Sequence, residues 1–216
     1  MNDSLTASLQ PVLAAARKRM SEGMASLRSE YEARPHTATL LKGRAGLVDR
    51  EIAALWSACG MPAQAAVVAV GGYGRGELFP ASDVDLLILL PERPDDALQT
   101  RLATLVGALW DMGLEIGHSV RTVDDCMIAA ADDITVQTSL LEARLLAGNT
   151  SLFAELVTRY RDTLDVRAFY KAKLLEQEQR YARFNETPYA LEPNCKESPG
   201  GLRDLQMLGW IARAAG

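Results

Sequence analysis

Helical spacing of apolar residues runs through the first sixty positions of the chain. The pattern predicts one helix over residues 3–33 and a second over about 38–59, which stops before Gly60. Pro11 lies inside the first run, so we expect a kink or a restart of the helix there. Residues 1–62 are therefore expected to form a helical N-terminal segment.

The spacing of the apolar residues changes beyond this segment. The stretches "AAVVAVGG", "DVDLLILL" and "LEIGHSVRT" predict three strands, with one helix between the second and the third. From Val123 onward the pattern is helical, with segments near 123–131, 133–147, 150–161 and 165–185, then the polar loop "NETPYALEPNCKESPGG" and a last helix. That last helix either docks on the preceding ones or is covered by further chain. We expect the second, with this chain as the N-terminal part of something longer.

Composition and charge narrow the class of function. The 216 residues carry a net charge of -5 and a pI near 5.2, whereas nucleic-acid-binding surfaces usually show a basic patch. Three widely spaced cysteines fit a reducing compartment better than a disulfide framework. No apolar run approaches the ~20 residues that span a bilayer, and the N-terminus lacks the features of a signal peptide. We expect a cytoplasmic protein that binds neither nucleic acid nor membrane.

Asp83 and Asp85 lie one residue apart at the start of an aliphatic run. In a strand, residues two apart project from the same face. Two adjacent carboxylates repel each other and resist burial, and a divalent cation relieves both costs. Mg²⁺ takes oxygen ligands and often holds substrate phosphates in its remaining positions. The pair predicts a metal site for phosphoryl chemistry; the alternative is a strand cap followed by a residue at a wet sheet edge.

A glycine-rich loop lies between the first two predicted strands. Gly71 and Gly72 directly follow the first strand, and glycine lets backbone N–H groups approach a phosphate closely. Arg75 adds a guanidinium that could fork onto a phosphate. The connection from Tyr73 to Ser82 is short, so the loop and the Asp pair can face one nucleotide.

These motifs carry a resemblance to a known family. "GGYGRGELFPASDVDLLIL" resembles the signature of the DNA polymerase β-type nucleotidyltransferases. Within that superfamily the chain is similar to the PII uridylyltransferases, on "LWDMGLEIGHSVRT", "TSLLEARLLAGN" and "EPNCKESPGGLRDLQMLGWIA" as well. The resemblance implies an α+β fold: a small mixed β-sheet core flanked by helices in residues 63–150, and the start of a helical domain, truncated here, in residues 151–216.

The resemblance also implies an activity. UMP would pass from UTP to a tyrosine of the PII nitrogen-regulatory protein, with release of pyrophosphate. Asp83 and Asp85 would be the catalytic residues and would hold Mg²⁺, while the nucleotide would be bound by residues of the glycine loop and of the later loop, namely Gly71, Gly72, Arg75, Ser82, Lys196 and Arg203. The alternatives are a protein adenylyltransferase acting on glutamine synthetase, and an inactive fragment that binds nucleotide or PII. The sequence leaves open whether the nucleotide donor is UTP or ATP.

Two positions depart from the family pattern. A third carboxylate often lies on a later strand, but the matching position here is Gly117, so Glu115, two residues earlier, is the candidate for the third metal ligand. A solvent-facing Glu115 is an equally good interpretation. Ser198 replaces the first glycine of the later loop, and serine does not adopt a positive φ at low cost.

Further polar residues have two interpretations each. Lys196 and Arg203 flank "SPGG", where a helix begins, so they mark either an anion site or a simple loop-to-helix cap. His118 is either a substrate contact or a hydrogen-bonded strand residue. Arg121 could meet a phosphate or pair with a nearby acid.

Overall fold

A four-stranded mixed sheet forms the centre of the computed structural model, which describes residues 2–184, 187–189, 191–192 and 194–216. The strand order is β3-β2-β1-β4. β1 is antiparallel to both of its neighbours, β2 and β4, whereas β3 runs parallel to β2. The predicted small mixed sheet is confirmed, with strands β1 (Ala66–Ala69), β2 (Val84–Leu90), β3 (Ile116–Thr122) and β4 (Arg144–Gly148).

The fourth strand corrects the sequence prediction. A single helix was expected over 133–147, but α6 (Ile134–Leu141) is short and the chain then extends into β4. The reason is that β1 needs a partner on its second edge, and pairing with β4 satisfies the backbone groups of that buried strand. Gly148 is the last residue of the strand. Only glycine fits there, because its φ is 98° and a Cβ would lie 2.2 Å from the carbonyl oxygen of Ala65.

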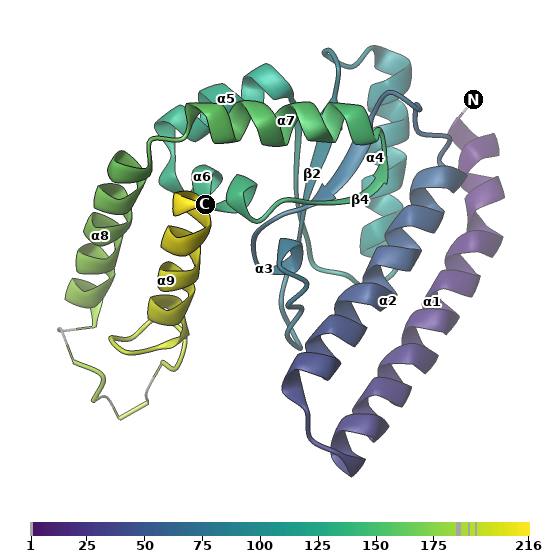
Figure 1. Ribbon diagram of the computed structural model, residues 1–216. Coiled ribbons are helices and arrows are strands. Elements are labelled where there is room, and N and C mark those ends of the chain that lie inside the picture. Colours follow the sequence, from purple (N-terminus) through teal and green to yellow (C-terminus); the bar gives the residue numbers. More distant parts are fainter. Residues whose placement is uncertain (1, 185–186, 190, 193) are drawn as a thin grey trace.

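Each face of the sheet has its own hydrophobic core, since side chains alternate along each strand. One face packs against the helices α1 (Asn2–Ala33), α2 (Thr37–Ala58) and α4 (Asp96–Asp111). The opposite face packs against α5 (Val123–Asp132), α6 and α7 (Thr150–Thr163). In Figure 1, α1 and α2 lie on the far side of the sheet from α8 (Val166–Arg183) and α9 (Leu202–Ala215). Helices therefore flank the sheet as predicted.

The N-terminal helix does not restart at Pro11, where the sequence predicted a kink or a restart. α1 runs without a break from Asn2 to Ala33, with Pro11 inside it. Pro11 is exposed, so the carbonyl group that loses its helical partner can be hydrated. None of the described helices is apolar over a stretch long enough to cross a bilayer.

A third, smaller core joins the last two helices. Phe169 of α8 and Met207 and Trp210 of α9 are buried together. This core also contacts Leu141 at the end of α6, so α9 is packed against the sheet-bearing part of the chain. The polar loop predicted between these helices includes residues 185–186, 190 and 193, which lie outside the described residues. The predicted division at residues 62 and 150 stays a prediction.

Candidate active site

The two aspartates stand at the entrance of β2. Val84 is buried and points into the core, while Asp83 and Asp85, on either side of it, are exposed on the other face. Both carboxylates line a cavity of about 680 Å³. Partial burial, together with the neighbouring charge of Asp83, raises the pKa of Asp85, and Lys196 opposes this effect. The sequence prediction that the pair shares one face is confirmed.

The donor set of this pair fits a hard divalent cation. Within the described residues, no side chain or backbone N–H donates a hydrogen bond to the carboxylate of Asp83 or Asp85, and neither carboxylate forms an ion pair. No third acid, His or Cys of these residues completes a cluster with them. Two oxygen-donating side chains leave several coordination positions open, which suits a cation that also binds substrate phosphates.

The glycine-rich loop forms a single helical turn, α3 (Gly71–Gly74), directly after β1. Gly71 has a φ of 59°, and a Cβ there would lie 3.4 Å from Oδ2 of Asp85. The glycine turn and the Asp85 carboxylate are thus neighbours. Gly74 packs even more closely, because a Cβ there would lie 2.2 Å from the carbonyl oxygen of Glu142. The glycine turn and the Asp pair, which the sequence predicted to face one site, therefore lie side by side.

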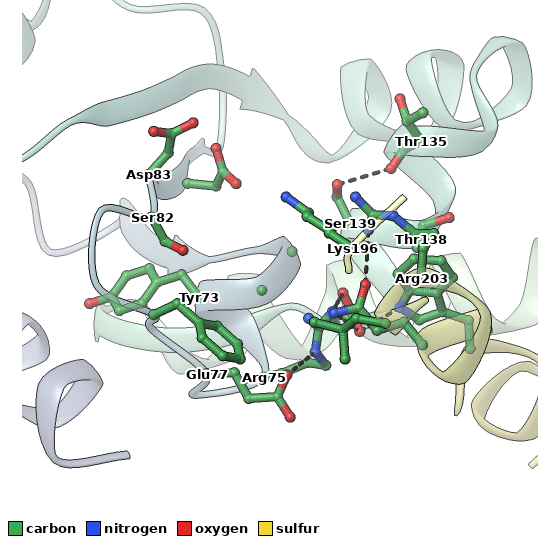
Figure 2. A pocket seen from close by; sticks show the side chains of 18 of the residues that line it. Tyr73, Arg75, Glu77, Ser82, Asp83, Thr135, Thr138, Ser139, Lys196 and Arg203 are labelled. Carbon is green, nitrogen blue, oxygen red and sulfur yellow. Dashed lines mark hydrogen bonds and ion pairs between the residues drawn. The ribbon is translucent and has the colours of Figure 1, made fainter. Parts of the chain in front are cut away.

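Backbone strain marks the connection between the glycine turn and the aspartates. Ala81 has a φ of 61°, in the left-handed region that non-glycine residues rarely adopt. It precedes Ser82, which lines the cavity beside Asp83 (Figure 2). Strained residues of this kind often cluster at functional sites.

Arg75 is already engaged by protein carboxylates. Its Nη1 donates to both carboxylate oxygens of Glu142, at 2.7 and 2.6 Å, and its Nε donates to Glu77 at 2.9 Å. The Glu142 side chain is 1% exposed and also accepts a 2.6 Å hydrogen bond from Nε1 of Trp210. We call Arg75, Glu142 and Trp210 the Glu142 cluster. It joins the glycine turn to α9, so Arg75 supports the cavity wall, and its predicted contact with the nucleotide stays a prediction.

A second polar group holds the glycine turn from the other side. The hydroxyl of Tyr73 donates to Asp49 of α2 at 2.6 Å. Arg144 of β4 bonds to the same carboxylate and to the backbone carbonyls of Tyr73 and Gly74. Burial and then Asp49 raise the pKa of the Tyr73 phenol, which stays a neutral donor. The turn is fixed by elements distant in sequence.

The wall opposite the aspartates comes from the last loop and α9. Lys196 and Arg203 both line the cavity. Figure 2 shows Asp83 and Ser82 on one side, Arg203 on the other, and Lys196 extending between them. Arg203 pairs with Glu197 at 3.1 Å, whereas Lys196 forms no ion pair with any described residue. A free ammonium facing two carboxylates across a cavity is placed to bind a bridging phosphate.

Ser198 does not disturb this loop. Gly200 has a positive φ of 78°, but Ser198 does not. The Ser198 hydroxyl instead donates to the carbonyl of Asn194 at 2.5 Å, and the Asn194 side chain accepts from the N–H groups of Lys196 and Glu197. Serine therefore fits where the family pattern has glycine.

Glu115 does not join the aspartates. It is exposed, precedes β3, and is not part of the cavity lining. The residue paired with Asp85 across the sheet is Gly117, and a Cβ there would lie 2.5 Å from Oδ1 of Asp85. The geometry gives Glu115 no support as a metal ligand, and its assignment stays a prediction.

Several polar residues of the cavity were missed from the sequence. Thr135, Thr138 and Ser139 line it from α6, and their spacing places three hydroxyls on one helix face, a signal that the sequence did contain. Lys173 of α8 is 3% exposed, bonds to Glu176 at 2.5 Å and lies 4.2 Å from the centre of the Trp210 ring. No local pattern distinguishes this lysine from its exposed neighbours, because its burial depends on α9.

Comparison with known proteins agrees with this geometry. A nucleotidyltransferase domain family matches residues 51–130, and the GlnD PII-uridylyltransferase family matches residues 168–216. A bifunctional uridylyltransferase/uridylyl-removing enzyme of Aromatoleum aromaticum is 67% identical over 210 residues, 97% of this chain and 24% of the relative. Enzymes of the same name from Burkholderia mallei and Burkholderia pseudomallei are 55% identical over 192 residues, 89% of this chain and 22% of each relative. The chain thus spans about a quarter of the length of these relatives.

Proposed function

The chain belongs to the PII-uridylyltransferase family, and from this premise we propose that it carries the nucleotidyltransferase site of such an enzyme. The reaction is transfer of UMP from UTP to a tyrosine hydroxyl of the PII protein, with release of pyrophosphate. The observation that carries the proposal is the convergence of the Asp pair, the glycine turn and Lys196 on one cavity. Its volume of about 680 Å³ lies inside the ~300–1,000 Å³ range of small-molecule sites.

The residues divide into three groups: acidic, uncharged and basic. Asp83 and Asp85 are the ligands for Mg²⁺, which when bound neutralises phosphate charge and lowers the pKa of an attacking hydroxyl. Gly71 and Gly72 present backbone N–H groups to the triphosphate, and Ser82 adds a hydroxyl beside Asp83. Lys196 and Arg203 bring positive charge from the opposite wall.

The chemical step is a single displacement at the α-phosphorus. A bond forms between the phenolic oxygen of the acceptor and the α-phosphorus, and the bond from that phosphorus to the oxygen bridging to the β-phosphate breaks. Pyrophosphate leaves with the electron pair, and the phenolic proton passes to water. The protein's part is to hold both reactants in line and to stabilise the charge that moves onto pyrophosphate.

The test compares two donors and two acceptors. The chain is incubated with Mg²⁺, with UTP or ATP labelled in the α-phosphate, and with PII or glutamine synthetase. We expect label on PII from UTP only, and no label when the PII tyrosine is replaced by phenylalanine. Label from ATP on glutamine synthetase would support the adenylyltransferase alternative. Binding of UTP without any transfer would support a fragment that binds but does not react.

A further inference from the structure

A second, smaller cavity adjoins the first on the other side of Asp85. Its volume is about 270 Å³, and it shares Asp85, Thr135 and Ser139 with the larger one. Its floor is the edge strand β3, through Gly117, Ser119 and Arg121. It is smaller than the ~300 Å³ lower limit of typical small-molecule sites. The larger cavity has the volume of a small-molecule site, whereas the smaller one has room for a single side chain.

Gly117 lines the second cavity beside Asp85, one of the residues that the two cavities share. It faces Asp85 across the β2–β3 pair, and a Cβ there would lie only 2.5 Å from Oδ1 of Asp85. Its φ is not in the left-handed region, so the backbone itself does not call for glycine. Glycine is needed because no side chain fits between this strand and Asp85. The missing side chain leaves the Asp85 carboxylate open toward the second cavity.

Strand β3 also has a free edge. Among the strands that the structure describes, it is the last in the order β3-β2-β1-β4, so within these residues its backbone pairs on one side only. An edge strand of this kind can receive an extended peptide, which bonds to its backbone while single side chains enter pockets. Arg121 adds a positive charge on the cavity floor, and its guanidinium makes no ion pair or hydrogen bond with the described residues.

In-line displacement fixes where an acceptor must enter. The attacking oxygen and the leaving pyrophosphate lie on opposite sides of the reacting phosphorus. With the triphosphate along the glycine turn and Lys196, the free approach is from the far side of Asp85, where the second cavity opens. Both reactants can then meet at the same carboxylate.

On the basis of the proposed function, we infer that this second cavity is the acceptor site. An extended loop of the acceptor protein lies along the edge of β3, its tyrosine side chain enters beside Ser119, and its hydroxyl reaches the α-phosphorus through the space left by Gly117. Arg121 binds a carboxylate or a backbone carbonyl of the loop.

Two variants and a matched control test the site. Ser119→Leu fills the cavity floor, and Arg121→Gln removes the charge but keeps a polar side chain. Val120→Thr changes the intervening residue, which does not line either cavity. The KM for PII and the KM for UTP are measured for each, together with UTP affinity by calorimetry and a thermal melt.

The expected result is a rise of tenfold or more in the KM for PII with Ser119→Leu and Arg121→Gln, while the KM and affinity for UTP stay within twofold. Val120→Thr should change neither. An unchanged KM for PII in both variants would overturn the acceptor site and leave the transferase function standing. An equal rise in both KM values would place these residues at the nucleotide and also overturn it. If the unsubstituted chain transfers no UMP to PII, the proposed function fails, and the acceptor site fails with it.

Discussion

Replacing Glu142 with alanine should destabilise the protein far more than replacing a comparable surface acid. The Glu142 side chain is 1% exposed, and it accepts hydrogen bonds from Arg75 and from Trp210. Burial lowers the pKa of Arg75, but the bonds to Glu142 more than offset this, so the guanidinium stays charged. Removing the carboxylate leaves the indole N–H of Trp210 without its partner, and leaves the Arg75 guanidinium, 13% exposed, with only the exposed Glu77 as a charge partner among the described residues.

The size of the effect follows from this burial. Breaking a buried ion pair by removing one partner costs about 3–5 kcal/mol, because the other charge stays buried and uncompensated. For a domain of this length, each kcal/mol lowers Tm by about 2–4 °C. Glu142→Ala should therefore lower Tm by roughly 6–20 °C. Glu142→Gln keeps an acceptor and should cost less.

Glu77 provides the matched control. It bonds to the same guanidinium at 2.9 Å, but its side chain is 45% exposed, and exposed pairs contribute only about 0–1 kcal/mol. Urea denaturation of Glu142→Ala, Glu77→Ala and Arg75→Ala, with both double variants, gives the coupling energy of each pair. A coupling of Glu142 with Arg75 no larger than that of Glu77 would refute the role of the Glu142 cluster.

Two further predictions concern single positions. Gly117→Ala should abolish UMP transfer while leaving Tm within a few degrees, because the new Cβ would lie 2.5 Å from Oδ1 of Asp85 and would displace that carboxylate. A transfer assay with a parallel thermal melt measures both effects. Normal activity of this variant would contradict the close contact between Gly117 and Asp85. Hydrogen bonds from Arg180, Tyr181 and Gln177 outweigh burial and lower the pKa of Asp204 to about 2. A depressed folded-state pKa means that this stabilisation, about 2 kcal/mol, is present above the unfolded value near 4 and is lost as pH falls toward 2. The difference in unfolding free energy between the protein and Asp204→Asn should therefore shrink over that interval, and a difference independent of pH would show that the carboxylate charge is not the cause.

The placement of the two aspartates on one face and the glycine turn could be predicted because both features are local in the sequence. Alternation along a strand puts Asp83 and Asp85 on one face whatever surrounds them. A glycine pair directly after a strand marks a tight turn. Lys196 and Arg203 were singled out through their motif, and both line the same cavity as the aspartates.

The remaining features depend on contacts between distant residues. Strand β4 was taken for helix because "EARLL" has good helical propensity, and only its pairing with β1 makes it a strand. The ion pair of Arg75 with Glu142 could not be predicted, because Glu142 comes 67 positions later in the chain. The burial of Lys173 likewise depends on Trp210, which arrives from another helix.

Replacing Asp85 with asparagine tests the central claim most directly, because the change keeps the shape of the side chain and removes the charge that would hold Mg²⁺. UTP binding is measured by calorimetry with and without Mg²⁺, and UMP transfer to PII is measured under the same conditions, with Asp95→Asn as the control on an exposed helix cap. We predict that Asp85→Asn loses Mg²⁺-dependent UTP binding and at least 100-fold in transfer, with an unchanged melt, while Asp95→Asn keeps both activities. Transfer at the unsubstituted rate by Asp85→Asn would contradict the assignment of this cavity as the nucleotidyltransferase site.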